Sequence, residues 1–301
     1  MTKESYFLAR LVIGSRDEIE IEKSEYDNLL RARRVLSEFT SLDEKFFAIC
    51  ENYRDIEEFI FKSALEDAVF GKGSVPDLYG VGAQFGRRIG SFLSSVRLFF
   101  DVIGTHVYEI SHDIKLKDGA KIKKSKCYDD NFNYRVMEEI RNHSQHRAFP
   151  VHLTTFSRKR DGELDDILFS LDFYLDIYQL FDDKFKKSVR NELEALPGKF
   201  NLKRGVRSYF EEICKIHKEV KAELDPFQLN AVNAIEDARL KWSSVFEDNF
   251  FTGVAACLLK DGKLVKEFKK IYISRQLDEY REHLHKRTQN IKSIVNYRYD
   301  M

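Results

Sequence analysis

Apolar residues recur every three or four positions over most of the chain, which is the spacing of one face of an α-helix. The pattern predicts a helix from Ser24 and a second helix opened by a capping box, Ser41 with Glu44. A third and longer helix is predicted over 81–110. The glycines and the proline of segment 71–80 predict a break between the second and third helices.

The second half of the chain repeats this spacing in shorter runs. One predicted helix covers about 130–147 and stops before Pro150, because the residue that precedes a proline is pushed out of the helical region. The other predicted helices are 184–195, 204–223, one that begins at Asp225-Pro226, and 275–290. The lysine-rich segment 113–126 contains a glycine and is expected to be a turn-containing connector.

Alternation of apolar and polar residues, typical of strands, is confined to short segments. A strand over 5–13 is expected to pair with 18–22. Two hairpins are predicted, and each has an Asp-Gly turn at its centre; they are 151–158 with 165–174, and 252–259 with 264–274. We therefore expect a mostly α fold of the α+β class, a helical core with two β-hairpin additions.

Three segments are expected from this order of elements. Residues 1–80 would supply a strand and helices that pack on the core, 81–245 the helical core with the hairpin 151–174 inserted, and 246–301 the second hairpin and a closing helix. The 301 residues, 43% of them hydrophobic, suffice for a large core.

Charge and cysteine content narrow the class of protein. Lysine plus arginine equals aspartate plus glutamate at 50 each, so a polyanion would have to bind a local patch rather than the whole surface. Four scattered cysteines without a CxxC pair are typical of reduced thiols in a cytosol. We find neither a signal peptide nor an apolar run of the roughly 20 residues that a membrane helix needs, so a cytoplasmic protein without a membrane partner is expected.

The densest cluster of polar chemistry is Arg141-Asn142-His143-Ser144-Gln145-His146-Arg147, at the end of the predicted helix 130–147. Histidine gains and loses a proton near neutral pH, and arginine offers a permanently charged fork of donors for a phosphate. Together they suit cleavage of RNA, in which a base takes the proton of a ribose 2′-hydroxyl and a cation stabilises the charge that develops on the phosphate. This chemistry requires no metal or cofactor, and DNA lacks the nucleophile.

This cluster resembles the motif of the HEPN superfamily, written R-x(4–6)-H, whose ribonuclease members carry a polar residue beside the arginine. Arg141, Asn142 and His146 match its three positions, with four residues between Arg141 and His146. The resemblance implies a HEPN-like helical bundle and a metal-independent endoribonuclease. It also implies a homodimer with a composite active site, and a role in toxin–antitoxin or anti-phage defence systems with a partner protein.

Within this hypothesis the side chains have different roles. Arg141, Asn142 and His146 are the candidate catalytic residues, and no residue is assigned to a metal. The candidate substrate-binding residues are Gln145, Arg147, Lys123 and Lys124, the lysines as part of a phosphate-tracking arm. The alternative interpretation of the lysine-rich segment 113–126 is a solvated surface loop without a binding role.

Other interpretations of the cluster stay open. Cations at a helix C-terminus also meet the negative end of the helix dipole, so Arg141 and His146 would then be structural. The protein would in that case be a non-catalytic interaction or regulatory module of a defence or mobile-element system. A nucleotidyl-transferring enzyme is disfavoured, since the sequence has neither a glycine-rich phosphate loop nor paired acidic metal ligands. Gly82, Gly86 and Gly90 predict close packing of the helix 81–110 against another helix, either of the same fold or of a dimer mate. Arg87 and Arg88 are expected to face either a polyanion or acidic side chains.

Overall fold

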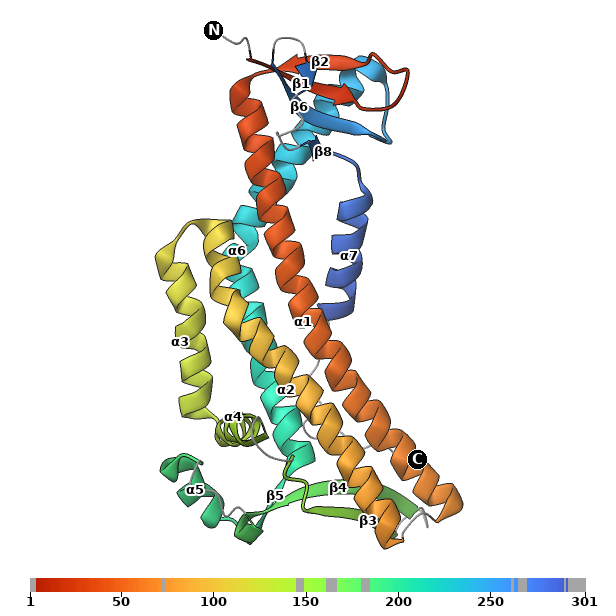
Figure 1. Ribbon diagram of the computed structural model, residues 1–301, viewed down its shortest axis with the longest axis vertical. Coiled ribbons are helices and arrows are strands. Elements are labelled where there is room, and N and C mark those ends of the chain that lie inside the picture. Colours follow the sequence, from red (N-terminus) through yellow and green to blue (C-terminus); the bar gives the residue numbers. More distant parts are fainter. Residues whose placement is uncertain are drawn as a thin grey trace. The chain divides into compact units, whose positions relative to one another are not determined.

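The computed structural model describes residues 4–71, 74–144, 149–160, 167–179, 185–260, 263–264, 270–289 and 291. Helices dominate, and the two sheets are small and antiparallel, so the expected mostly α fold of the α+β class is confirmed (Figure 1). The helices are α1 (Lys23–Phe70), α2 (Val75–Ser111), α3 (Ile114–Asp130), α4 (Phe132–Ser144), α5 (Lys187–Glu194), α6 (Leu202–Phe246) and α7 (Gln276–Thr288), with a 3-10 turn η1 (Ile177–Gln179).

Two compact units divide the chain, and each is assembled from separate stretches. Unit 1 contains 1–44, 103–117 and 220–289, and unit 2 contains 45–102, 118–219 and 290–301. Four helices, α1, α2, α3 and α6, have residues in both units. The predicted division into the consecutive segments 1–80, 81–245 and 246–301 stays a prediction.

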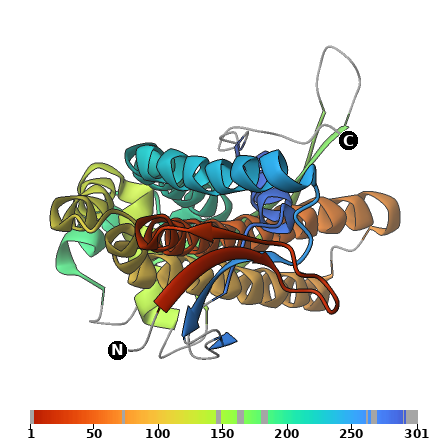
Figure 2. The ribbon, with the colours of Figure 1, turned by 90° about the horizontal axis from the view of Figure 1, so that it is seen from above.

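Unit 1 holds the first sheet. Its strands are β1 (Glu4–Arg10), β2 (Glu18–Ile21), β6 (Val254–Lys260), β7 (Lys263–Leu264) and β8 (Ile271–Tyr272). The predicted pairing of the first two strands and the predicted hairpin of β6 with β7 are confirmed, whereas the pairing of β1 with β6 was not foreseen (Figure 2). Leu8, Val254 and Trp242 are fully buried beneath this sheet.

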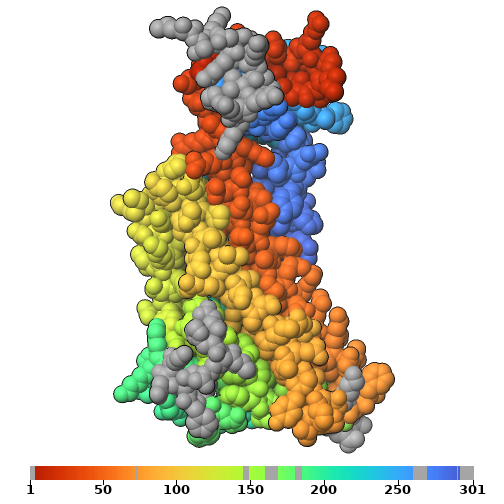
Figure 3. Space-filling model, viewed as in Figure 1, coloured from red at the N-terminus to blue at the C-terminus, as the bar shows by residue number. Residues whose placement is uncertain are grey.

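Unit 2 holds the second sheet and the candidate site. The predicted hairpin here is confirmed as β3 (Leu153–Arg160) with β4 (Ile167–Asp176), and β5 (Lys199–Asn201) pairs with β4. Phe173 of β4 stacks on Phe85 of α2 with ring centroids 3.6 Å apart, which fixes the sheet on this helix. The second half of α1 lies beside α2 at the surface, with Arg88 of α2 paired to Asp55 of α1 (Figures 1 and 3).

Two of the predicted helix starts, at Ser41 and at Asp225, are absent from the structure. No new helix begins at Ser41, because Phe39, Leu42 and Phe46 continue the buried stripe across it and α1 runs on. Likewise no helix begins at Asp225, since α6 continues through Pro226.

The other two differences concern the ends of α2 and the lysine-rich segment. The predicted break 71–80 is shorter than expected, because α2 begins at Val75, where a proline in the first turn is tolerated. The segment 113–126 is helical rather than a connector. Asp113 caps α3 by accepting a hydrogen bond from the Lys115 backbone N–H (2.7 Å), and most residues that follow favour a helix.

Candidate functional site

Helix α4 carries the arginine of the candidate site on a firmly packed base. Val136, Met137 and Ile140 are fully buried in the core of unit 2. The helix ends at Ser144, whose hydroxyl donates to the Arg141 carbonyl (2.9 Å). The orientation of Arg141 is therefore set by the core of unit 2 rather than by a loop.

Arg141 is itself nearly buried, with 8% of its surface exposed. Its Nη1 lies 3.0 Å from Glu138 Oε2, an ion pair between residues one helical turn apart. Its Nη2 donates to the Asn142 side-chain oxygen (2.9 Å). Nε and Nη1 are buried without a hydrogen bond to any described residue, although Nη1 keeps its ion pair with Glu138. Part of the donor capacity of this buried guanidinium is therefore unsatisfied among the described residues.

Glu138 anchors Arg141 from below. It is 6% exposed and accepts a hydrogen bond from the Tyr209 hydroxyl of α6. Burial, and then the negative charge of Glu138, raise the pKa of Tyr209 well above its usual value, so this hydroxyl stays protonated and donates. A carboxylate held in this way fixes the position of the guanidinium above it.

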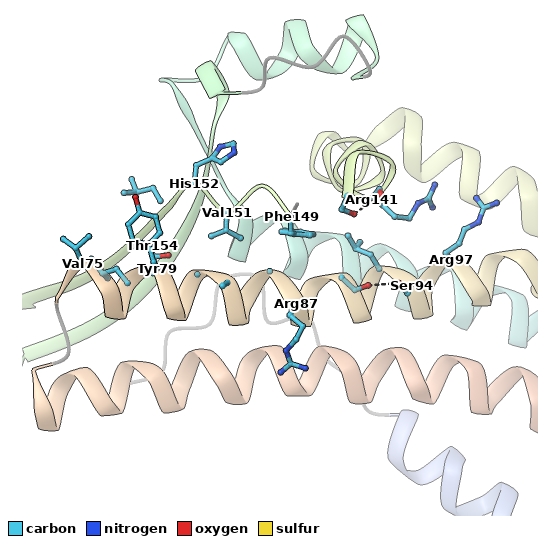
Figure 4. A pocket seen from close by; sticks show the side chains of 18 residues that line it. Val75, Tyr79, Arg87, Ser94, Arg97, Arg141, Phe149, Val151, His152 and Thr154 are labelled. Carbon is cyan, nitrogen blue, oxygen red and sulfur yellow. Dashed lines mark hydrogen bonds between the residues drawn. The ribbon is translucent and has the colours of Figure 1, made fainter. Parts of the chain in front are cut away.

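A cavity of about 930 Å³ lies in unit 2, with Arg141 in its wall (Figure 4). Its lining comes from α2, from the end of α4 and from the segment that leads into β3. The lining residues are Val75, Leu78, Tyr79, Gly82, Ala83, Gly86, Arg87, Gly90, Leu93, Ser94, Arg97, Arg141, Ser144, Phe149, Val151, His152, Leu153 and Thr154. The volume falls within the range of ligand-binding clefts.

The glycines of α2 form part of this lining, and the predicted partner helix is wrong for two of them. A methyl group at Gly82 would lie 2.7 Å from the Thr154 hydroxyl oxygen, and one at Gly86 would lie 3.2 Å from Phe149 Cβ. The partner is thus the chain around β3, which approaches the helix backbone closely. Gly90 has open space at the corresponding position, so the cavity extends over it.

Positive charge gathers at one end of the cavity. In Figure 4 the side chains of Arg97 and Arg141 lie near each other at one end, while Val75 and Tyr79 lie at the other. Lys124 of α3 joins the cationic end, because its Nζ is 3.8 Å from Glu138 Oε2. Burial, together with the positive charges of Arg141 and Arg97, lowers the pKa of Lys124 despite the opposing effect of Glu138. Arg97 in turn pairs with Asp101 (Nε to Oδ2 2.9 Å), so three cations face two carboxylates, and the net positive charge of the cationic end favours an anion.

The two neighbouring arginines of α2 have different surroundings. Arg88 pairs with Asp55 (Nε to Oδ2 3.2 Å) and lies 4.2 Å above the Phe59 ring, so its charge is used within unit 2. Arg87 lines the cavity but points away from Arg97 and Arg141 in Figure 4. We therefore leave both out of the cationic end.

The structure describes only some of the site residues that the sequence predicts. Gln145, His146 and Arg147 lie outside the described residues. Asn142 is exposed and bonds to Arg141, as described above, and Ser144 lines the cavity. His143 packs near Phe185, with ring centroids 5.8 Å apart. Of the two lysines, Lys124 belongs to the cationic end, and Lys123 is half-buried on α3 away from the cavity lining.

Several residues of the site were missed at the sequence level. Arg97, Tyr79 and Phe149 line the cavity, and Glu138 and Tyr209 hold its arginine. A signal existed for two of them, because Tyr79 and Arg97 lie 18 residues apart, about five helical turns, and so on one face of α2. Nothing in the sequence indicates that Tyr209 meets Glu138, 71 residues away.

Comparisons with models of protein families, with curated proteins and with solved structures each find no match to this chain. None of the helices among the described residues is long and apolar enough to cross a membrane. The chemistry of the site must therefore be argued from its own geometry.

Proposed function

We propose that this protein is a metal-independent endoribonuclease of the HEPN type. One observation carries the proposal: Arg141, nearly buried and held by Glu138, lies in the wall of a cavity that Arg97 also lines. An arginine held in this position is suited to bind a phosphate, because its planar guanidinium can donate hydrogen bonds to two oxygens of the same phosphate group.

The proposed reaction uses the substrate's own nucleophile. His146 takes the proton of a ribose 2′-hydroxyl, and the oxygen forms a new bond to the adjacent phosphorus. The bond from phosphorus to the 5′-oxygen breaks, and that oxygen takes up a proton from solvent and leaves as a 5′-hydroxyl. Arg141 stabilises the negative charge on the phosphate as the bonds exchange, and Asn142 holds the arginine in place. The products carry a 2′,3′-cyclic phosphate and a 5′-hydroxyl.

The wider setting follows from the same resemblance. We propose RNA as the substrate, a homodimer that completes the site, and a toxin–antitoxin or anti-phage role with a partner protein in the cytoplasm. The four cysteines, all free, support a reducing compartment.

The experiment is cleavage of unmodified RNA by the purified full chain in excess chelator. Wild type is expected to cut, and His146→Ala and Arg141→Ala to lose roughly 100-fold or more in rate. DNA of the same sequence serves as the control that lacks the 2′-hydroxyl, and Arg88→Ala as the control for a general loss of positive charge. Wild type without activity, or His146→Ala with full activity, would refute the nuclease.

A second candidate is a binding module without catalysis. The ion pair of Arg141 with Glu138 favours it, since a paired and buried arginine is also what a structural role requires. The two functions separate in the same experiment, because a binding module retains RNA in a filter or anisotropy assay but leaves it uncut.

A further inference from the structure

The cavity is bounded at its two ends by side chains of different character on one face of α2. Tyr79 and Arg97 mark the ends of this face, and the positions between them on it are small. They are Ala83, Gly86, Gly90 and Ser94, spaced three or four residues apart. Phe149 lies over Gly86, whereas Gly90 faces open space. The face is therefore a shallow channel with an aromatic side chain at one end and a cation at the other.

The aromatic end has an apolar surrounding and is open to solvent. Tyr79 is 75% exposed, and Val75 and Leu153 beside it are 64% and 43% exposed. One exposed tyrosine would mean little by itself. Here the tyrosine shares a cavity with Arg141, a nearly buried arginine that keeps unused donors among the described residues.

We propose that Tyr79 is a specificity-determining residue that stacks on a nucleobase of the bound RNA, several nucleotides away from the phosphate held by Arg141 and Arg97. The inference rests on the proposed function for the identity of the ligand. Grooves that bind single strands combine cations for the backbone with aromatic rings for the bases, and both are present here. Between them the lining also contains Phe149 and Leu93, and the open stretch of the channel lies over Gly90.

The length of the helix sets the distance between the two subsites. The 18 residues from Tyr79 to Arg97 correspond to a rise of about 27 Å along α2. Stacked nucleotides advance about 3.4 Å each, so Tyr79 meets a base no more than about eight nucleotides from the bound phosphate, and fewer in an extended strand. A short oligonucleotide therefore occupies the cationic end without reaching Tyr79.

The test uses labelled 2′-O-methyl RNA, which cannot be cut because its 2′-oxygen is blocked. Binding of strands of about 4 and about 12 nucleotides is measured by anisotropy for the full chain. Tyr79→Ala is expected to weaken binding of the longer strand by about 5- to 150-fold, which corresponds to the loss of one stacked base, and to leave the shorter strand unaffected. Tyr79→Phe should bind as wild type does. Tyr178→Ala is the matched control, because Tyr178 is equally exposed (76%) and lies outside the cavity lining.

An abasic nucleotide moved along the longer strand locates the stacked base. Wild type should lose affinity at one position, and Tyr79→Ala should be insensitive there. The inference would be overturned if Tyr79→Ala lost the same affinity for both strand lengths, or lost affinity for neither. It would also be overturned if the wild-type protein did not bind the longer strand. Failure of the nuclease proposal is a separate result, since uncut natural RNA with intact, Tyr79-dependent binding leaves the stacking subsite standing.

Discussion

Glu57 and Arg207 form the most deeply buried ion pair between distant parts of unit 2. Two hydrogen bonds of 2.7 and 2.8 Å join the carboxylate of α1 to the guanidinium of α6, and the Tyr53 hydroxyl donates to the same carboxylate (2.9 Å). We predict that Glu57→Ala destabilises the protein by about 3–5 kcal/mol, because it leaves a buried guanidinium without its counter-charge. Urea unfolding measures this. Glu57→Gln, which keeps shape and one acceptor, should lose less; equal losses would contradict the electrostatic explanation.

Cys127 gives a residue-scale prediction about pH. Burial, and then its hydrogen bond to Glu212, raise the pKa of this half-buried thiol to about 12, so at pH 8 only roughly one thiol in 10,000 is ionised. We expect very slow alkylation by iodoacetamide at pH 8 in the folded protein, a rate that rises about tenfold per pH unit towards pH 11, and fast alkylation in urea. Mass spectrometry of the Cys127 peptide follows it. A pH profile that flattens near pH 9 would show an ordinary thiol.

At this scale the sequence is informative about local pairs and silent about distant ones. Glu138 and Arg141 are one helical turn apart, so their contact follows from helix geometry alone. The contact of Glu138 with Tyr209 depends on how α4 packs on α6, which no local rule supplies. The same reason explains why Arg97, far from the motif in sequence, was missed as its neighbour.

At the scale of elements, the stripe of α2 glycines separates tight packing from open space. Gly82→Ala is predicted to destabilise the protein by about 1–2 kcal/mol, since the added methyl group meets Thr154 and Val151 of the chain around β3. Gly90→Ala is the matched control and should stabilise by about 0.5–1 kcal/mol, because alanine favours the helix and nothing lies within 4 Å. Thermal unfolding of both variants decides; a destabilised Gly90→Ala would contradict the open channel.

Pro226 gives a second prediction for an element. It lies inside α6, is exposed, and lacks the N–H that the helix would use. We predict that Pro226→Ala stabilises the protein by up to about 3 kcal/mol, measured as a higher urea midpoint. An unchanged or lower midpoint would mean that the proline is matched to a local distortion of the helix.

These two helices also show where element prediction from sequence succeeds and fails. The type of most elements was correct, because periodicity reports which face is buried. Boundaries failed at Ser41 and Pro226, where a local stop signal competes with a buried stripe that continues on both sides. At both positions the burial of many residues in a continuous helix outweighs the helix-stop signal of a single residue. The same holds for α3, where helix-favouring residues outweigh Gly119.

For the whole molecule, zero net charge makes the salt dependence of binding diagnostic. If the cationic end, Arg97, Arg141 and Lys124, is the only contact with phosphates, a plot of log affinity against log salt should have a slope of about −2 for a single strand. Lys124→Ala should reduce the slope by about 0.7, and Lys45→Ala, on α1, should not. A slope much steeper than −4 would indicate a wider surface.

Because the two units alternate along the sequence, their evolution is constrained. Each unit is encoded by three separate stretches of the chain, and four of the five boundaries between them fall inside helices rather than in linkers. A single recombination event therefore cannot transfer one unit to another gene, as happens with domains that follow one another along a chain. Duplication, fusion or truncation would act on both units together, so they are expected to have diverged as one hereditary module.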